Sequence, residues 1–366
     1  MDKVTRQNCT ATPVPFDAPY AALRVDPSLE IKTLTALRPY RPSGFVLRRD
    51  ELAGKALVHN YGHGGCGVTL SWGCAEQAAD LVDSKAGDGV AVIGAGVIGL
   101  STARVLQGRG YKVTVYAEDF PPNTTSDVAG AYWYPITLYE EGAVSRVFLA
   151  QFRAAAREAY RQFFSLVGDP RYGVSWMRFF ELGEEAPKAT QNTCIEGEEL
   201  YPGKEFVTDP ARALGFPYAV RHHGFMIDPE IFLPALIEDI EEEGGHLERR
   251  RFETREDIAD LAEPHIVNCT GLGAKALFDD DEMIPVKGQL SLIERPEGID
   301  YGYALGRGET DYCYMFPRRS SLVIGGTKHV GREDLDHDDN DRQRMFEGHS
   351  EILDRLRKSV GQNWEE

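Results

Sequence analysis

The spacing of hydrophobic and polar residues along the chain predicts a mixture of strands and helices. Apolar side chains alternate with polar ones over residues 29–47, and two Arg-Pro steps near the end of this stretch predict a strand that meets a rigid turn. Short alternating segments later in the chain predict strands of an antiparallel sheet over residues 286–294, 311–318 and 320–328.

Other segments have the three-to-four-residue apolar spacing of helices: 68–82, 143–166, a segment that starts at Asp228-Pro229 and ends near 245, and 347–360. The charged stretch 331–343 is expected to be a solvated loop. Residues 89–117 predict a strand, a helix and a second strand, which is a βαβ unit. Together these elements indicate an α/β plus α+β fold, in which a parallel layer is interleaved with an antiparallel sheet.

A glycine fingerprint opens the helix of the βαβ unit. Gly94, Gly96 and Gly99 follow an apolar strand in the pattern G-x-G-x-x-G. The first glycine permits a tight turn, the second lets a pyrophosphate approach the backbone, and the third lets the helix pack on the strand. Glu118 ends the second strand, where a carboxylate can accept the ribose hydroxyls of adenosine. The pattern predicts a dinucleotide site but does not choose between FAD and NAD(P).

A second glycine-rich turn occupies residues 59–67, His-Asn-Tyr-Gly-His-Gly-Gly-Cys-Gly, after an apolar run. Backbone that lies against a flat ligand needs residues without side chains. His59 and His63 in this turn are interpreted as hydrogen-bonded packing residues. No metal is expected, because no third ligand accompanies them at metal-site spacing.

Charge and composition narrow the function classes. The chain has 40 basic and 58 acidic residues, and its net charge of −18 opposes nucleic acid and anionic membranes. It has no apolar run of membrane-spanning length and no signal-like apolar segment at residues 1–17, so a cytoplasmic protein is expected. Its six scattered cysteines indicate reduced thiols rather than a disulfide framework.

Five segments together resemble the D-amino-acid oxidase family of FAD enzymes: residues 37–42, 59–79, 94–103, 115–135 and 266–271. The resemblance covers most of residues 20–366. It implies non-covalently bound FAD and oxidative deamination of D-amino acids to 2-oxo acids, ammonia and hydrogen peroxide. In that reaction a hydride passes from Cα to flavin N5, and dioxygen is the second substrate.

The resemblance also implies the domain organisation. It predicts a Rossmann-like FAD-binding domain over 46–137 and 226–285, and a substrate-binding domain over 1–45, 138–225 and 286–366. Members of the family are often homodimers, although no sequence feature here specifies an interface.

The order of the motifs departs from the family pattern. In the family the glycine fingerprint lies near the N-terminus, and the blocks that match residues 37–42 and 59–67 lie near the C-terminus. Here Arg38 and His59 precede Gly94. The chain therefore resembles a circular permutant with its old ends joined near residues 83–89. If so, the strand around residues 33–39 shares a sheet with 286–294 and 311–317.

By the same resemblance, three residues form the catalytic site. Arg38 matches the arginine that binds the substrate carboxylate, a task that suits the fork of a guanidinium. Tyr314 matches the tyrosine whose hydroxyl adds a second bond, and Gly65 matches the glycine whose carbonyl receives the amine. Without the resemblance, Arg38 would be interpreted as a surface ion-pair residue and Tyr314 as a core aromatic.

Substrate selectivity is assigned to Phe316 and Lys328. Family members selective for acidic D-amino acids carry a basic residue at the position of Lys328, and those for neutral substrates carry an apolar one. Lys328 could instead point to solvent at a strand end. The lid tyrosine of some members falls on Thr310, which leaves three candidates to replace it: Tyr301, Tyr303 and Tyr312.

The cofactor residues implied by the family pattern come from both glycine turns and from the ends of the predicted strands: Gly62, Gly64, Gly65, Gly67, Val68, Thr69, Gly94, Gly96, Val97, Ile98, Gly99, Glu118, Asp119, Thr125, Ser126, Tyr132, Trp133, Phe252, Thr270 and Gly271.

Four alternatives to a broad D-amino-acid oxidase stay open. They are a D-aspartate/D-glutamate-selective oxidase, an FAD amine dehydrogenase, a glycine/sarcosine-type oxidase and an inactive flavin-binding homologue. The block at residues 59–67 argues against the glycine/sarcosine type, and the presence of Arg38 and Tyr314 argues against an inactive homologue.

Overall fold

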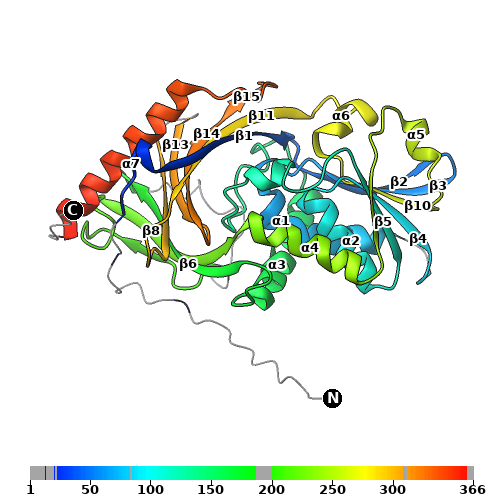
Figure 1. Ribbon diagram of the computed structural model, residues 1–366, viewed down its shortest axis with the longest axis horizontal. Coiled ribbons are helices and arrows are strands. Elements are labelled where there is room, and N and C mark those ends of the chain that lie inside the picture. Colours follow the sequence, from blue (N-terminus) through cyan, green and yellow to red (C-terminus); the bar gives the residue numbers. More distant parts are fainter. Residues whose placement is uncertain are drawn as a thin grey trace, which may run out of the picture.

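The computed structural model describes residues 13, 20, 23–82, 85–186, 200–307 and 311–360 (Figure 1). Within these residues the larger of two sheets contains nine strands: β1 (Glu30–Tyr40), β6 (Val174–Gly183), β7 (Glu205–Val207), β8 (Tyr218–Ile227), β11 (Ile284–Glu294), β12 (Tyr301–Gly306), β13 (Asp311–Pro317), β14 (Ser321–Thr327) and β15 (His329–Val330). Their order is β1-β11-β14-β13-β12-β6-β8-β7, and β15 pairs with β11. The antiparallel strands predicted for residues 286–328 are confirmed.

The smaller sheet contains six strands: β2 (Val46–Leu52), β3 (Lys55–Tyr61), β4 (Gly89–Ile93), β5 (Lys112–Ala117), β9 (His246–Arg249) and β10 (His265–Asn268). Their order is β2-β3-β10-β4-β5-β9, and all neighbours are parallel except the hairpin of β2 and β3. The predicted βαβ unit is confirmed as β4, α2 (Val97–Gly108) and β5. The mixed α/β architecture agrees with the fold class expected from the sequence.

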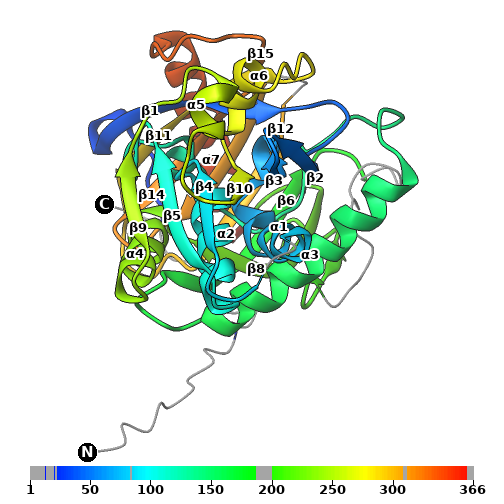
Figure 2. The same ribbon diagram turned by 90° about the vertical axis from the view of Figure 1, so that its right-hand side faces the viewer.

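The other helices are α1 (Gly67–Leu81), α3 (Arg146–Leu166), α4 (Pro229–Glu242), α5 (Arg255–Ala259), α6 (Ala274–Leu277) and α7 (Asp339–Val360). α1 packs against α2 and α3, and α2 packs against α4, so these four helices form one layer beside the smaller sheet (Figure 2). No helix in the described parts of the chain combines the length and apolar character that crossing a membrane requires.

One predicted boundary is wrong. α7 begins at Asp339, so residues 339–343 at the end of the charged stretch 331–343 are helical rather than a loop. The Asp338 carboxylate accepts the backbone N–H groups of Asn340 and Asp341 at 3.0 and 3.2 Å, as a helix-capping side chain does. Asp341 in the first turn adds negative charge where the helix dipole favours it.

The two faces of the larger sheet have different partners. α7 covers one face (Figure 1) and packs on apolar residues that alternate along the strands, including Tyr301, Tyr303, Met315 and Ile324. The residues between them point to the opposite face. That face carries the candidate site described below.

The N-terminal strand lies with C-terminal strands, as the motif order led us to expect. β1 runs antiparallel beside β11, with Thr35 opposite Gln289 and Arg38 opposite Val286 (Figure 1). β11 in turn connects β1 to β14 and β13 in the same sheet. The circular permutation itself and the proposed domain boundaries stay predictions.

A glycine sets the distance between α1 and α3. A Cβ added at Gly73 would lie 1.8 Å from the backbone oxygen of Ala155, so the two helix backbones touch at this point. At Gly108, the last residue of α2, an added Cβ meets no described atom within 4 Å. Gly73 is therefore required for packing, whereas Gly108 is not.

We expect the same substitution to have opposite effects at these two positions. Gly73→Ala should lower the unfolding free energy by about 1–3 kcal/mol, because the helices must separate. Gly108→Ala should raise it by up to about 1 kcal/mol, because alanine is the better helix former. Denaturant unfolding of both variants measures these changes, and equal stability of the two variants would contradict the packing assigned to Gly73.

Candidate active site

A cavity of about 1110 Å³ is lined by residues of both sheets. At one end it reaches the N-terminus of α2 and the end of β5. At the other end it reaches Arg38 on β1 and Tyr314 on β13. Residues of both glycine turns identified in the sequence line this cavity.

The fingerprint turn has the backbone geometry that its glycines predict. Gly94 has φ +110°, and a Cβ there would lie 2.4 Å from the Cys269 carbonyl oxygen. A Cβ at Gly99 would lie 1.9 Å from the Gly94 oxygen, so Gly99 allows the helix to pack on the strand and does not line the cavity. The Ser126 hydroxyl accepts the Val97 N–H at the start of α2 at 2.9 Å.

The acidic residues after β5 lie at the rim of the same cavity. Glu118 forms a 2.7 Å ion pair with Arg251, and Asp119 forms a 3.0 Å pair with Arg249. All four side chains are exposed to solvent, so these pairs contribute little to stability. Phe252 lines the cavity beside them.

The second glycine turn joins β3 to α1. Gly62 and Gly64 have φ values of +85° and +53°, which side-chain-bearing residues rarely adopt. At Gly65 a Cβ would lie 2.3 Å from Thr137 Oγ1 and 3.9 Å from the Arg38 side chain. The turn therefore presents bare backbone to the cavity next to the arginine.

The two histidines of this turn are packed as predicted, but the buried Nε2 of His63 lacks the expected hydrogen bond among the described residues. The Asn268 amide bonds His59 Nδ1 at 3.0 Å, and His59 Nε2 lies 3.5 Å from Asp50. His63 stacks on Phe45 with ring centroids 5.0 Å apart. Among the described residues no group of three or more His, Cys, Asp or Glu could hold a metal ion.

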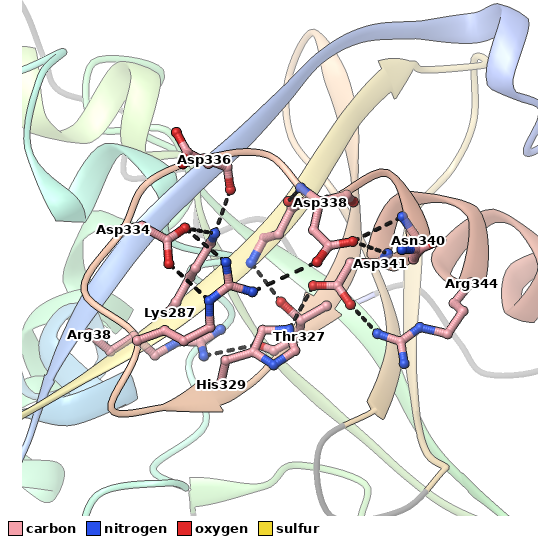
Figure 3. Close-up of polar contacts among 12 residues, drawn as sticks. Arg38, Lys287, Thr327, His329, Asp334, Asp336, Asp338, Asn340, Asp341 and Arg344 are labelled. Carbon is pink, nitrogen blue, oxygen red and sulfur yellow. Dashed lines mark hydrogen bonds and ion pairs between the residues drawn. The ribbon is translucent and has the colours of Figure 1, made fainter.

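Arg38 presents a cation to the cavity. Its Nη1 donates to the Thr327 carbonyl oxygen at 3.1 Å (Figure 3). Its guanidinium is in hydrogen-bonding contact with the Tyr314 hydroxyl. No carboxylate in the described parts of the chain forms an ion pair with it. A Cβ at Gly288 on the adjacent strand would lie 2.6 Å from Arg38 Nη2, so that glycine makes room for the guanidinium.

Tyr314 is fixed by the glycines of the neighbouring strand. Added Cβ atoms at Gly325 and Gly326 would lie 2.4 and 2.6 Å from its ring or hydroxyl. Burial raises the pKa of Tyr314 even though the nearby Arg38 acts in the opposite direction. The hydroxyl is therefore protonated at neutral pH and can donate a hydrogen bond toward the cavity.

A polar network joins β11 and the segment before α7 to Thr327, whose carbonyl oxygen bonds Arg38 (Figure 3). The Gln289 backbone N–H donates to Thr327 Oγ1 at 2.9 Å. The Gln289 side chain bonds the backbone of Asp338 in both directions, at 2.8 and 2.9 Å. Lys287, which is fully buried, bonds Asp334 and the carbonyl of Asp336. The segment before α7 is thus tied to the strand beside Arg38.

The residues assigned to the substrate side chain also face the cavity. Phe316 stacks on Tyr314 with ring centroids 4.9 Å apart. Lys328 is half-buried and its Nζ lies 6.0 Å from the Tyr40 ring centroid. Tyr312 lines the cavity, whereas Tyr301 and Tyr303 lie on the face covered by α7. Thr310 lies outside the described residues.

One assigned cofactor residue lies elsewhere. Trp133 is buried against Tyr160, Tyr201 and Phe225 and does not line the cavity. Successive residues of an extended segment point to opposite sides, so Tyr132 faces the cavity and Trp133 faces the core. Apart from Gly99 and Trp133, every assigned cofactor residue lines the cavity.

Sequence reasoning missed three residues of this region: Gly288, Thr327 and Glu181. A glycine inside a strand, as in Val-Lys-Gly-Gln-Leu, signals a close approach of another group, so Gly288 could have been found. Thr327 acts through its backbone oxygen, which no side-chain pattern reveals. Glu181 interrupts the apolar stretch Phe-Phe-Glu-Leu, and a charge on a strand face that is otherwise buried is a detectable signal.

Comparison with known proteins identifies the family. The family model described as FAD dependent oxidoreductase matches residues 89–365. The chain belongs to this family. Its cofactor is FAD, and the glycine turns fit it, because Gly64–Gly65 and Gly94–Gly96 offer backbone and a helix N-terminus where side chains would fill the space.

Relatives and a solved structure agree with this assignment. The chain is 30% identical over 268 residues to a D-amino-acid oxidase of Rubrobacter xylanophilus, covering 73% of this chain and 77% of the relative. It is 33% identical over 250 residues to that of Streptomyces coelicolor, covering 68% and 72%. Human D-aspartate oxidase is 28% identical over 265 residues, covering 69% and 73%. The fold is similar to iminodiacetate oxidase from Chelativorans, with TM-score 0.51, 16% identity and coverage of 73% and 79%.

Burial of His63 generates a prediction about pH. Burial lowers the pKa of His63 to about 3, from the ordinary value of 6.5. The unfolded chain therefore binds a proton between these values that the folded chain does not, and stability falls as the pH drops below 6.5. The His63→Phe variant lacks this proton uptake on unfolding. Its unfolding free energy should therefore rise relative to that of the wild type by about 1.4 kcal/mol for each pH unit below 6.5.

Thermal unfolding of the FAD-loaded protein from pH 7 to 4.5, at a fixed excess of FAD, measures the effect. His246→Gln, at an exposed position on β9, is the matched control and should follow the wild type. Parallel curves for His63→Phe and the wild type would show that His63 is protonated in the folded protein.

Proposed function

We propose that the protein is a D-amino-acid oxidase that forms 2-oxo acids, ammonia and hydrogen peroxide. The observation that carries the proposal is the guanidinium of Arg38, which faces the cavity beside the Tyr314 hydroxyl and has no carboxylate partner in the described part of the chain. A half-buried cation that faces a cavity can be paired by an anion, and the carboxylate of an amino acid supplies one. The D-amino-acid oxidases among the relatives support the stereochemistry.

In this proposal the chain's own residues position the substrate. Arg38 binds the substrate carboxylate through its two-pronged fork, and Tyr314 donates a further hydrogen bond to it. The carbonyl of Gly65 accepts a hydrogen bond from the amine. These contacts hold the Cα–H in one orientation, and orientation alone can supply several kcal/mol of the barrier reduction. No side-chain acid or base is required at Cα.

The cofactor is assigned to the remaining lining residues. Gly94, Gly96 and the start of α2 would hold the pyrophosphate, Glu118 the adenosine ribose, and the turn at Gly62–Gly67 the flavin. When bound, FAD supplies the hydride acceptor and returns the electrons to dioxygen.

The decisive experiment is anaerobic mixing of the purified FAD-loaded protein with panels of D- and L-amino acids. We expect bleaching of the flavin absorbance by D-amino acids only, and oxygen uptake with peroxide release when air is admitted. Bleaching without oxygen uptake would identify a dehydrogenase. Bleaching by glycine or sarcosine in preference to D-amino acids would identify the other oxidase type. No bleaching by any amine would overturn the proposal.

Arg38 gives a quantitative test. Arg38→Ala should lower kcat/KM by roughly 30- to 5,000-fold, corresponding to about 2–5 kcal/mol for loss of a buried charge partner. Arg38→Lys should recover little, because an ammonium cannot form the bidentate contact. The control is Arg161→Ala on the exposed surface of α3, where the side chain is 72% exposed. Near-normal kcat/KM in Arg38→Ala would remove Arg38 from the site.

A further inference from the structure

The register of the larger sheet places an acidic side chain beside Tyr314. Residues paired across neighbouring strands point to the same face of a sheet. Tyr314 on β13 is opposite Ala304 on β12, and Ala304 is opposite Glu181 on β6. Glu181 therefore faces the cavity two strands beyond Tyr314, at about 10 Å between Cα atoms from ordinary strand spacing.

The strand between them forms the floor of a trough. Its cavity-lining residues, Ala304 and Gly306, are small, and a Cβ added at Gly306 would meet no described atom within 4 Å. Larger residues of the flanking strands form the walls: Tyr312, Tyr314 and Phe316 on β13, and Phe179 and Glu181 on β6. A ligand group that leaves Tyr314 along this trough reaches Glu181.

The surroundings of Glu181 suit a cation. The Tyr134 hydroxyl donates to Glu181 Oε2 at 3.2 Å, and Tyr134 itself lines the cavity. Tyr132 stacks on Phe179 with ring centroids 4.4 Å apart, and both rings line the cavity. Burial lowers the pKa of His222, which packs on Phe179, to about 4, so that ring is neutral at pH 7.

The larger sheet places opposite charges on the two sides of Tyr314. Arg38 on β1 and Lys328, directly after β14, lie on one side in the strand order, and Glu181 on β6 lies on the other. A ligand with an anionic end at Arg38 and a cationic end at Glu181 matches this polarity. Lys328 reinforces the anionic end in this arrangement.

We propose that the trough over β12 binds the substrate side chain and that Glu181 selects D-amino acids with a cationic side chain, such as D-lysine and D-arginine. The proposal rests on the proposed oxidase function. It requires a side chain long enough to cross one strand, which the four-carbon stem of lysine and the guanidinium arm of arginine provide. A shorter or apolar side chain does not form this ion pair.

Steady-state kinetics of the FAD-loaded enzyme test the selection. D-lysine and D-norleucine have stems of the same length and differ in the terminal ammonium, so the ratio of their kcat/KM values isolates the charge. We expect a ratio of roughly 10 to 100 in the wild type, as for a partly buried charge pair. Glu181→Gln keeps an acceptor for the Tyr134 hydroxyl but removes the charge, and should bring the ratio to about 1.

Two further variants make the result specific. Glu141→Gln, at an exposed carboxylate that lines the same cavity away from the trough, should leave the ratio at the wild-type value. Lys328→Met should also keep the preference for D-lysine over D-norleucine. A wild-type ratio near 1, or a ratio unchanged by Glu181→Gln, would overturn the proposal. A preference for D-aspartate that Lys328→Met abolishes would assign selectivity to Lys328 instead.

Binding without turnover separates this proposal from the oxidase function. 6-Aminohexanoate and hexanoate present the stem of lysine with and without the terminal ammonium, and neither carries an α-amine to oxidise. Calorimetry should show 6-aminohexanoate binding roughly tenfold or more tightly, with the difference lost in Glu181→Gln. This outcome together with no oxidation of any D-amino acid would refute the oxidase and keep the cationic subsite. Oxidation of D-amino acids together with equal binding of 6-aminohexanoate and hexanoate would refute the cationic subsite and keep the oxidase.

Discussion

The antiparallel pairing of β1 with β11 is the constraint on which the site depends. It brings Arg38, near the beginning of the chain, to the same sheet face as Tyr314, near its end. Arg38 gains its position from β11 and β14: Gly288 leaves space for the guanidinium, and Thr327 offers the carbonyl that receives one of its N–H groups. A shift of β1 by one residue would turn Arg38 to the opposite face and leave the cavity without its cation.

Glycine residues shape the cavity as much as the side chains that line it. Gly288, Gly325 and Gly326 let the arginine and the tyrosine pack against backbone, and the two glycine turns expose backbone along the remaining length. Arg38, Tyr314 and Glu181 stand on different strands of the larger sheet. Each of these three is therefore positioned by the register of a whole sheet rather than by a loop, which leaves it little freedom to rearrange.

Local signals predicted the local structure well. The apolar spacing located α1, α2, α3 and α4, and the glycine fingerprint located the turn before α2. The start of α7 was missed because a run of charges hid the capping role of Asp338. The resemblance to a family, not the residue pattern, pointed to Arg38 and Tyr314 as partners. Neither the residue pattern nor the resemblance pointed to Glu181. Its nearness to Tyr314 follows from the parallel pairing of β6 with β12, which lie more than a hundred residues apart in the sequence, and no local pattern encodes that pairing.

The bonds behind Arg38 extend the region in which sequence changes can matter for activity. From the first turn of α7, contacts run from the Asp338 backbone to Gln289, from Gln289 to Thr327, and from the Thr327 carbonyl to Arg38. Asp338 does not line the cavity itself, whereas Gln289 and Thr327 do. We therefore expect substitutions in the acidic segment before the last helix to act on Arg38 at a distance. During divergence of such enzymes, that segment could tune substrate affinity while every residue that touches the substrate stays the same.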